Sequence, residues 1–319
     1  MRAFQVTEYG QPASLRDVER PQPGQGEVLI RIEACALNFA DLLMIKGTYQ
    51  VLPDLPFSPG MEVAGTIEAI GPDTDALPLG TRVAVYGGNG GLAELGCFPA
   101  SLCVALPDSM DAQTAAAFQV AYSTSHVALD YRAGLQAGET LLVLGAAGGV
   151  GLTAVELGAQ MGATVIAAAR GADKLAVAKD RGAHHLIDTN TDDLRDVVKS
   201  LGGADVVYDP IGGDLFKAAL RSCKPEARVL TIGFASGDVP QIAANHILVK
   251  NITVIGFYWG GYVNFKPKVL TDSLTRLFQM HAAGQITPHI SHSLPIEQAA
   301  EALELLRSRK STGKVVVTL

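Results

Sequence analysis

The feature that most constrains the fold is a glycine-rich segment, Gly145 to Gly151, which directly follows the apolar run at residues 141–144. The segment reads A-x-G-x-x-G from Ala146 and G-x-x-G-x-x-G from Gly145. A buried strand, a glycine turn and a helix in this order form the setting of a dinucleotide-binding fingerprint. The alternative is a tight strand-to-helix turn that holds no nucleotide. The helical pattern after the turn consists of Leu152, Val155, Leu157 and Met161.

Glycines in such a turn let the backbone approach a pyrophosphate, and the helix N-terminus offers unpaired N–H groups. We therefore expect Ala147, Gly148, Gly149 and Val150 to bind the cofactor's phosphates. Between about residues 121 and 256, further apolar runs alternate with helical patterns at intervals of roughly 20 to 30 residues, which predicts βαβ units and a parallel sheet. One predicted strand is Thr164–Ala169.

The first third of the chain has a different pattern. Apolar and polar residues alternate at 27–33, the period of a half-buried strand, and short strands are expected at 62–70 and 81–86. A helix is expected at 39–46, ending at Gly47. A last strand at 314–319 is expected to return to this domain.

We therefore predict an α/β protein with a partly antiparallel β-barrel domain, residues 1–120 and 264–319, and a doubly wound parallel-sheet domain, residues 121–263. The length of 319 residues suits two domains, and 48% hydrophobic with 18% charged residues excludes disorder as the main state. A net charge of −7 without basic clusters argues against nucleic-acid binding. The longest uncharged stretch near the middle, residues 140–155, is too short for a membrane span.

Four scattered cysteines, without a CxxC pair, favour free thiols in a reducing compartment, so a cytoplasmic protein is expected. The start of the chain has no apolar signal region.

The end of the second predicted strand indicates which dinucleotide binds. An NAD site usually has an acidic residue about 20 residues past the glycines, for the ribose 2′-hydroxyl. Here the strand ends in Arg170, and Lys174 follows. Both cations suit a 2′-phosphate, which predicts NADPH. The alternative is that both are ordinary solvated charges, and Asp173 between them counts against a phosphate site.

Several motifs carry a family resemblance: ALNFAD at 36–41, KGTY at 46–49, PGMEVAG at 59–65, Thr124 before 128–129, the glycine turn, and TGKVV at 312–316. Together they resemble the zinc-independent quinone oxidoreductase branch of the medium-chain dehydrogenase/reductase superfamily, along essentially the whole chain. The resemblance implies a GroES-like catalytic domain, a Rossmann domain and a homodimer or homotetramer, of which we expect the dimer.

The resemblance also explains why no metal site is expected. Zinc members of the superfamily hold the catalytic metal with Cys, His and Cys, often near a Glu. The corresponding positions here are Asn38, Met61 and Gln119 or Val120, and only Glu62 matches. No four-cysteine lobe lies between Gly80 and Leu106 either.

For catalysis, the resemblance implies Asn38, Tyr49 and Asp41 in the nicotinamide cleft. Asn38 would donate to the acceptor carbonyl or the carboxamide, and Tyr49 would stack on the substrate or donate a proton. The alternatives are that Asn38 caps the following helix, that Tyr49 is a turn aromatic and that Asp41 orients the loop. In many relatives the position of Leu43 carries a tyrosine.

Further cofactor contacts are implied at Thr124, Lys314 and the ends of the fifth and sixth strands of the parallel sheet. Ligands of open α/β sheets bind at that edge. Lys314 is expected to reach the cofactor phosphates. The sixth strand ends in an aromatic run, FYW at 257–259, whose alternative role is a dimer interface or core. The strand-end residues are Ile232, Gly233, Phe234, Phe257 and Trp259.

Without a Lewis acid, hydride transfer favours acceptors that give a delocalised anion. We therefore expect NADPH-dependent reduction of a quinone or similar conjugated carbonyl compound. One alternative is reduction of an enone or a 2-enoyl thioester such as an acyl-CoA, with Lys46, Lys266 and Lys268 near its phosphates. Another is a crystallin-like protein that binds NADPH with little turnover.

Overall fold

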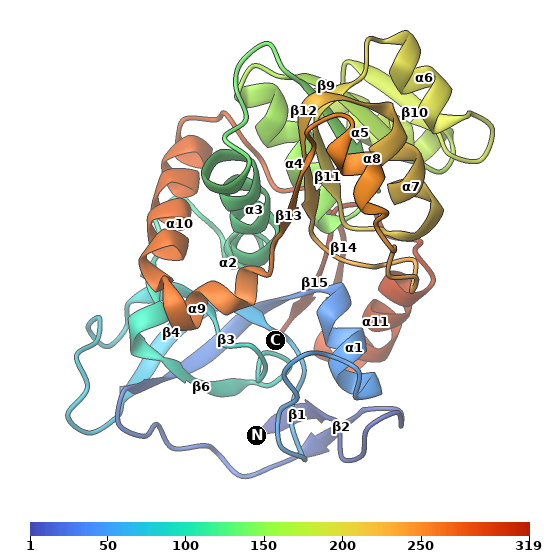
Figure 1. The fold of residues 1–319 in the computed structure, drawn as a ribbon. Helices are drawn as coiled ribbons and strands as arrows, with labels where there is room; N and C mark the ends of the chain where they lie inside the picture. Colours follow the sequence, from blue (N-terminus) through green and yellow to red (C-terminus); the bar gives the residue numbers. More distant parts are fainter. The chain divides into compact units, whose positions relative to one another are not determined.

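The computed structural model describes residues 1–319, which form two compact units (Figure 1). Unit 1 is Met1–Val120 with Pro288–Leu319, and unit 2 is Ala121–Thr287. The second boundary therefore lies at residue 288, not at the expected residue 264. The reason is that helix α10 (Pro267–Ala282) packs within unit 2, where Ser273 of α10 hydrogen-bonds to His126. No helix of the structure has the length and apolar character that a membrane crossing requires.

Unit 1 is built on a seven-stranded, largely antiparallel sheet, with one parallel pair, β14 and β15. The strand order is β14-β15-β3-β4-β5-β7, and β6 also pairs with β3. The predicted return of the last strand is confirmed, because β15 pairs antiparallel with β3. A separate hairpin joins β1 and β2. The strands are β1 (Arg2–Gln5), β2 (Ser14–Asp17), β3 (Glu27–Leu37), β4 (Glu62–Ile70), β5 (Arg82–Tyr86), β6 (Leu95–Pro99), β7 (Val104–Ala105), β14 (Ile290–Pro295) and β15 (Lys314–Thr318).

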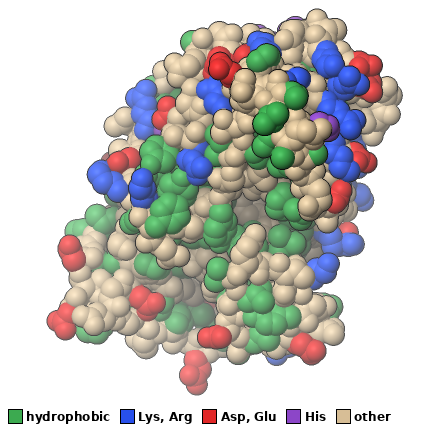
Figure 2. Space-filling model, in the orientation of Figure 1, with side chains coloured by type: hydrophobic (Ala, Val, Ile, Leu, Met, Phe, Trp, Pro, Cys, Tyr) green, Lys and Arg blue, Asp and Glu red, His purple; other side chains and the backbone are tan.

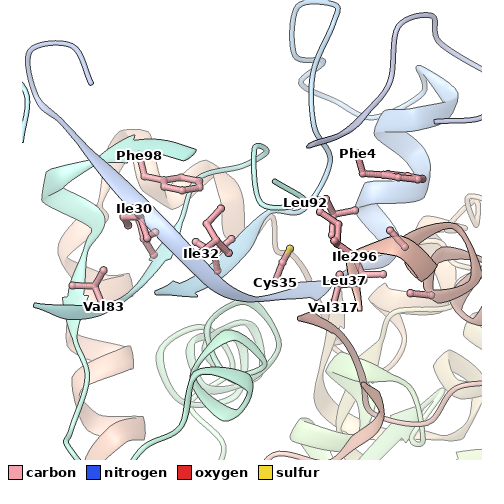
Figure 3. Close-up of a cluster of buried hydrophobic side chains, with 14 of the residues drawn as sticks. Phe4, Ile30, Ile32, Cys35, Leu37, Val83, Leu92, Phe98, Ile296 and Val317 are labelled. Carbon is pink, nitrogen blue, oxygen red and sulfur yellow. The ribbon is translucent and has the colours of Figure 1, made fainter. Parts of the chain in front are cut away.

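The helices of unit 1 are short. Helix α1 ends at Gly47, whose φ of 77° is the left-handed conformation that glycine adopts without steric cost. Buried side chains of the strands form the core of the unit, together with Ile296 and with residues of helix α11. Figure 3 shows Ile30 and Phe98 toward one end of this cluster and Leu37 and Ile296 toward the other. The helices are α1 (Phe39–Lys46), α2 (Ala112–Ala116) and α11 (Ala299–Arg307), with single 3-10 turns at Ala100–Leu102 and Ile296–Gln298.

Unit 2 contains a six-stranded, fully parallel sheet in the order β10-β9-β8-β11-β12-β13. In chain order this is 3-2-1-4-5-6, the order of the Rossmann fold, so the predicted parallel sheet is confirmed. Strands β8 and β9 are almost wholly buried, which explains their continuous apolar sequence. The strands are β8 (Thr140–Leu144), β9 (Thr164–Ala169), β10 (His185–Asp188), β11 (Ala204–Asp209), β12 (Cys223–Thr231) and β13 (Thr253–Gly256).

Helices connect these strands and pack on the sheet. Helix α4 contacts β8 and β9, α5 contacts β9 and β10, and α7 contacts β11 and β12. On the face of unit 2 that Figure 2 shows, basic and acidic side chains are interspersed. The helices are α3 (Gln119–His126) with a π-helical turn (Val127–Arg132), α4 (Gly149–Gln160), α5 (Ala172–Asp180), α6 (Leu194–Ser200), α7 (Gly213–Ser222), α8 (Ala244–Leu248), a 3-10 turn (Trp259–Gly261), α9 (Tyr262–Phe265) and α10.

Candidate active-site residues in the two units

The glycine turn of unit 2 links β8 to α4 by an unusually close approach of backbone to backbone. Gly145 has a φ of 60°, and a Cβ there would come within 2.6 Å of the Ile211 side chain. A Cβ on Gly151 would overlap the carbonyl oxygen of Gly145, so only glycine lets α4 start this close to the strand. Both residues therefore serve the packing of the turn.

Gly148 has a different role. It is exposed, its φ is −79°, and the nearest atom to an added Cβ would be the Gly145 carbonyl oxygen at 3.4 Å. The space beside it is open. The first N–H groups of α4, from Gly149 to Gly151, have no carbonyl one turn earlier to bind. An open surface lined by such N–H groups, at the positive end of a helix dipole, fits a pyrophosphate.

Arg170 directly follows β9, whose carboxyl end lies beside that of β8 in the sheet. Its side chain is exposed, and the structure gives it no hydrogen bond or ion pair. Lys174 lies half-buried in the first turn of α5. The next residue after Arg170, Gly171, donates its N–H to Asp188 at the end of β10, over 3.0 Å. This bond and a second from the Asn190 N–H hold the pKa of Asp188 below its usual value.

Asp209, at the end of β11, organises the neighbouring turn and was not predicted. Its carboxylate accepts the N–H of Ile211 (2.7 Å) and of Gly212, and its backbone carbonyl accepts the N–H of Ile232 (2.8 Å). Burial raises its pKa to about 6, against the lowering effect of the two N–H donors. Ile232 and Gly233 are thereby fastened to the carboxyl edge of the sheet, and Phe234 beside them is 39% exposed.

The aromatic run after β13 lies mostly inside unit 2. Phe257 and Trp259 are buried, and the Trp259 indole N–H donates to Ser123 Oγ over 2.9 Å. Thr124, the next residue on α3, is also buried. Phe257 and Trp259 are thus buried within unit 2, whereas Tyr258 between them is 41% exposed.

Unit 1 contains a buried polar cluster that joins two predicted site residues, Asn38 and Lys314, to Glu62. Lys314 Nζ donates to Glu62 Oε1 (2.6 Å), Asn38 Oδ1 (2.8 Å) and the Leu37 carbonyl (2.9 Å). Asn38 Nδ2 donates to Glu62 Oε1 over 2.9 Å, and Glu62 Oε2 accepts the Val120 N–H. All three ammonium hydrogens of Lys314 thus have acceptors inside unit 1. The ammonium therefore has no free hydrogen for the contact with the cofactor phosphates that was expected of it.

Asp41 is fully buried beside this cluster. Its Oδ2 accepts the Asn38 N–H (2.7 Å) and its Oδ1 accepts the Gly60 N–H (2.8 Å). Burial raises its pKa to about 6 although both donors lower it. Asp41 therefore links the start of α1 to the loop before β4, which fits the alternative that this residue orients the loop. Tyr49 is half-buried and packs against the cluster of Val6, Met44, Phe57 and Met61.

The residues at the family's zinc-ligand positions do not fit a zinc ion. Met61 belongs to an apolar cluster, and Gln119 donates its amide to the carbonyls of Val63 and Val85, over 3.1 Å each. Asn38 and Glu62 already bind the Lys314 ammonium. No group of three or more His, Cys, Asp and Glu side chains is arranged to hold a metal. A zinc site needs three or four such ligands.

Comparison with known proteins gives consistent family matches for both units. Residues 24–108 match the family model of the alcohol dehydrogenase GroES-like domain, and residues 149–275 match that of zinc-binding dehydrogenases. A curated relative is the quinone oxidoreductase-like protein 2 homolog of Nematostella vectensis, 38% identical over 99% of this chain and 88% of the relative.

Solved structures agree with this relationship. The quinone oxidoreductase of Thermus thermophilus, described with its NADPH complex, is 33% identical with a TM-score of 0.89, and each chain is covered completely. The Escherichia coli quinone oxidoreductase complexed with NADPH is 25% identical with a TM-score of 0.94, again over both whole chains. With its GroES-like and Rossmann-type units, this chain is an oxidoreductase that belongs to the zinc-independent quinone oxidoreductase branch of the medium-chain dehydrogenase/reductase superfamily.

Proposed function

We propose that the protein transfers a hydride from NADPH to a quinone or a similar conjugated carbonyl compound. The choice of NADPH rests on Arg170, which follows β9 and has no hydrogen bond or ion pair. The neighbouring strand of the sheet, β8, leads into the open N-terminus of α4. A pyrophosphate would lie over the open surface at Gly148 and bind the unpaired N–H groups of Gly149 and Val150. A 2′-phosphate would bind the Arg170 guanidinium. The two bacterial relatives, which are described as NADPH complexes, support the same cofactor.

Bound NADPH would supply the hydride, and a quinone that takes up one hydride and one proton becomes a hydroquinone. In unit 1, Asn38 would donate an amide hydrogen to the acceptor carbonyl, where negative charge develops during the transfer. Asp41 would hold the Asn38 backbone in place through the bond it already makes. Tyr49 would contact the acceptor with its ring or supply the proton, and Tyr49→Phe separates these roles because it keeps the ring.

The test is NADPH oxidation by chelator-treated protein with an ortho-quinone in one cell and a short enoyl-CoA in the other. Faster turnover of the quinone supports the proposal. Faster turnover of the enoyl-CoA would make the protein a carbon–carbon double-bond reductase instead. Of the lysines near which acyl-CoA phosphates would bind, Lys268 is paired with Asp272 and Lys266 donates to the Tyr131 hydroxyl. NADPH binding without oxidation by either acceptor would indicate the crystallin-like alternative.

We also propose that the protein is a homodimer formed through unit 2. Strand β13 is an edge strand of the six-stranded sheet, so one side of its backbone is unpaired. Leu248 and Val249, at the end of α8 just before this strand, are 74% and 72% exposed. Antiparallel pairing of two β13 strands would satisfy the free backbone groups and cover these side chains.

A further inference from the structure

The polar cluster of unit 1 contains a buried ion pair that contacts both ends of one amide. Lys314 is 4% exposed and Glu62 is fully buried. The ammonium binds Oδ1 of Asn38, and the carboxylate binds its Nδ2. No other side chain in the cluster is hydrogen-bonded to both charged groups: Asn38 accepts from Lys314 and donates to Glu62.

The sheet register explains how residues so distant in sequence meet. Strand β3 lies between β4 and β15. Ala36 pairs with Glu62 at the start of β4, and Leu37 pairs with Val315 at the start of β15. Asn38, which follows β3 directly, therefore lies where the first residues of both neighbouring strands converge.

These contacts allow the amide only one orientation. If the Asn38 amide were rotated by half a turn, its N–H groups would face the Lys314 ammonium and its oxygen would face the Glu62 carboxylate. Both new contacts would be repulsive, and repulsion between buried charged or polar groups is weakly screened. The amide nitrogen carries two hydrogens, and only one is used by Glu62. The second has no partner in the structure, and Asn38 is half-buried rather than enclosed.

We propose that Glu62 and Lys314 are positioning residues that act through Asn38, by fixing its amide so that the second Nδ2 hydrogen is presented to the acceptor carbonyl. The inference rests on the proposed function, because it requires Asn38 to contact the acceptor. A buried ion pair is a poor device for stability alone, since desolvation offsets much of its attraction. It is a good device for orientation, since two opposite charges distinguish the oxygen of an amide from its nitrogen.

The test is a mutant cycle that compares Asn38→Ala, the double variant Glu62→Gln/Lys314→Met, and the triple variant that combines them. The double variant is used because either single replacement leaves one buried charge without its partner. The matched control is Asp205→Asn/Lys224→Met, which removes a partly buried ion pair of unit 2 with a 2.7 Å contact. Measurements are kcat with the best acceptor, KM for NADPH and the NADPH Kd by fluorescence.

We expect Asn38→Ala to lower kcat by roughly 100-fold, the size typical for loss of one donor to a developing oxyanion. The Glu62/Lys314 double variant should lower kcat by about tenfold, since the donor remains but is misaligned. The triple variant should be no slower than Asn38→Ala, because the pair acts only through that amide. The Kd for NADPH should stay within about twofold throughout, and the control should keep its kcat.

Multiplying losses in the triple variant would overturn the inference, and so would an unchanged kcat in either Asn38→Ala or the double variant. If the double variant does not fold by circular dichroism, Lys314→Arg replaces it in the same cycle, since it keeps the charge but moves the donor. The same non-additive loss of kcat is then expected, and additive losses refute it. Failure of the proposed function is distinguishable, because the unmodified protein would then reduce neither a quinone nor an enone.

Discussion

Replacing Arg170 with alanine tests the cofactor assignment most specifically. The guanidinium is exposed and makes no hydrogen bond or ion pair, so its removal should leave the free energy of unfolding unchanged within about 0.5 kcal/mol. A hydrogen bond to a charged group contributes about 1.5–3 kcal/mol. Because the site is open to solvent and salt, we expect the lower limit, which corresponds to roughly tenfold weaker binding of NADPH.

NADH lacks the 2′-phosphate, so its Kd should not change in Arg170→Ala. The assay is fluorescence titration of both dinucleotides against both proteins at low and moderate ionic strength, and the NADPH difference should shrink as salt is added. The matched control is Arg195→Ala, which removes an exposed, unpaired arginine from α6 of the same unit. Equal losses for NADPH and NADH, or no loss for either, would refute the 2′-phosphate assignment.

Three further predictions concern the glycine turn, the buried carboxyl of Asp41 and the edge of the parallel sheet. The Gly148→Val variant should fold normally, because a φ of −79° and open surroundings accept a side chain, but it should bind NADPH at least tenfold more weakly. The Gly151→Ala variant should instead have a lower thermal midpoint of unfolding, because its Cβ overlaps the Gly145 carbonyl. Calorimetry gives the thermal midpoint of each variant, and titration with NADPH gives its Kd. The assigned roles would be contradicted if Gly148→Val lowered the thermal midpoint and Gly151→Ala weakened NADPH binding. Burial raises the pKa of Asp41 to about 6, above its unfolded value, so this group binds more protons in the folded state and its contribution to the free energy of unfolding falls as pH rises from about 4 to 6. Asp41→Asn removes this falling contribution, so the slope of the unfolding free energy against pH, measured by urea unfolding, should become more positive across that window. An unchanged slope would exclude the raised pKa. The Leu248→Glu variant should shift the dimer–monomer equilibrium toward the monomer, measured as a lower sedimentation coefficient. If the unmodified protein is a dimer and the variant has the same sedimentation coefficient, the interface lies elsewhere.

Local patterns predicted those parts of the fold that depend on neighbouring residues. Helix α1 and strands β4 and β9 have the predicted bounds, because alternation, apolar runs and the glycine stop at Gly47 are local signals. The glycine turn was likewise recognisable, since strand, turn and helix are contiguous.

Long-range pairing was not predictable in the same way. The Glu62–Lys314 ion pair joins residues 252 positions apart, and only the antiparallel register of β3 with both neighbours brings them together. For this reason the sequence suggested a contact between Lys314 and the cofactor phosphates, whereas in the structure its ammonium donates all its hydrogens to Glu62, Asn38 and Leu37. The role of Asp209 could not be predicted for a related reason. An acidic residue at the end of an apolar strand is a common pattern, and nothing in the neighbouring sequence indicates that its carboxylate will be buried and accept two backbone N–H groups.

The central claim, direct hydride transfer from NADPH to a conjugated acceptor, is tested most directly by a deuterium isotope effect. NADPH deuterated at either C4 position would be compared with unlabelled NADPH in single-turnover reduction of the best quinone by chelator-treated protein. We expect one hydroquinone formed per NADPH consumed, and a slower transfer with deuterium at one of the two positions only. Equal rates with all three cofactors, or NADPH loss no faster than in the absence of protein, would contradict the account.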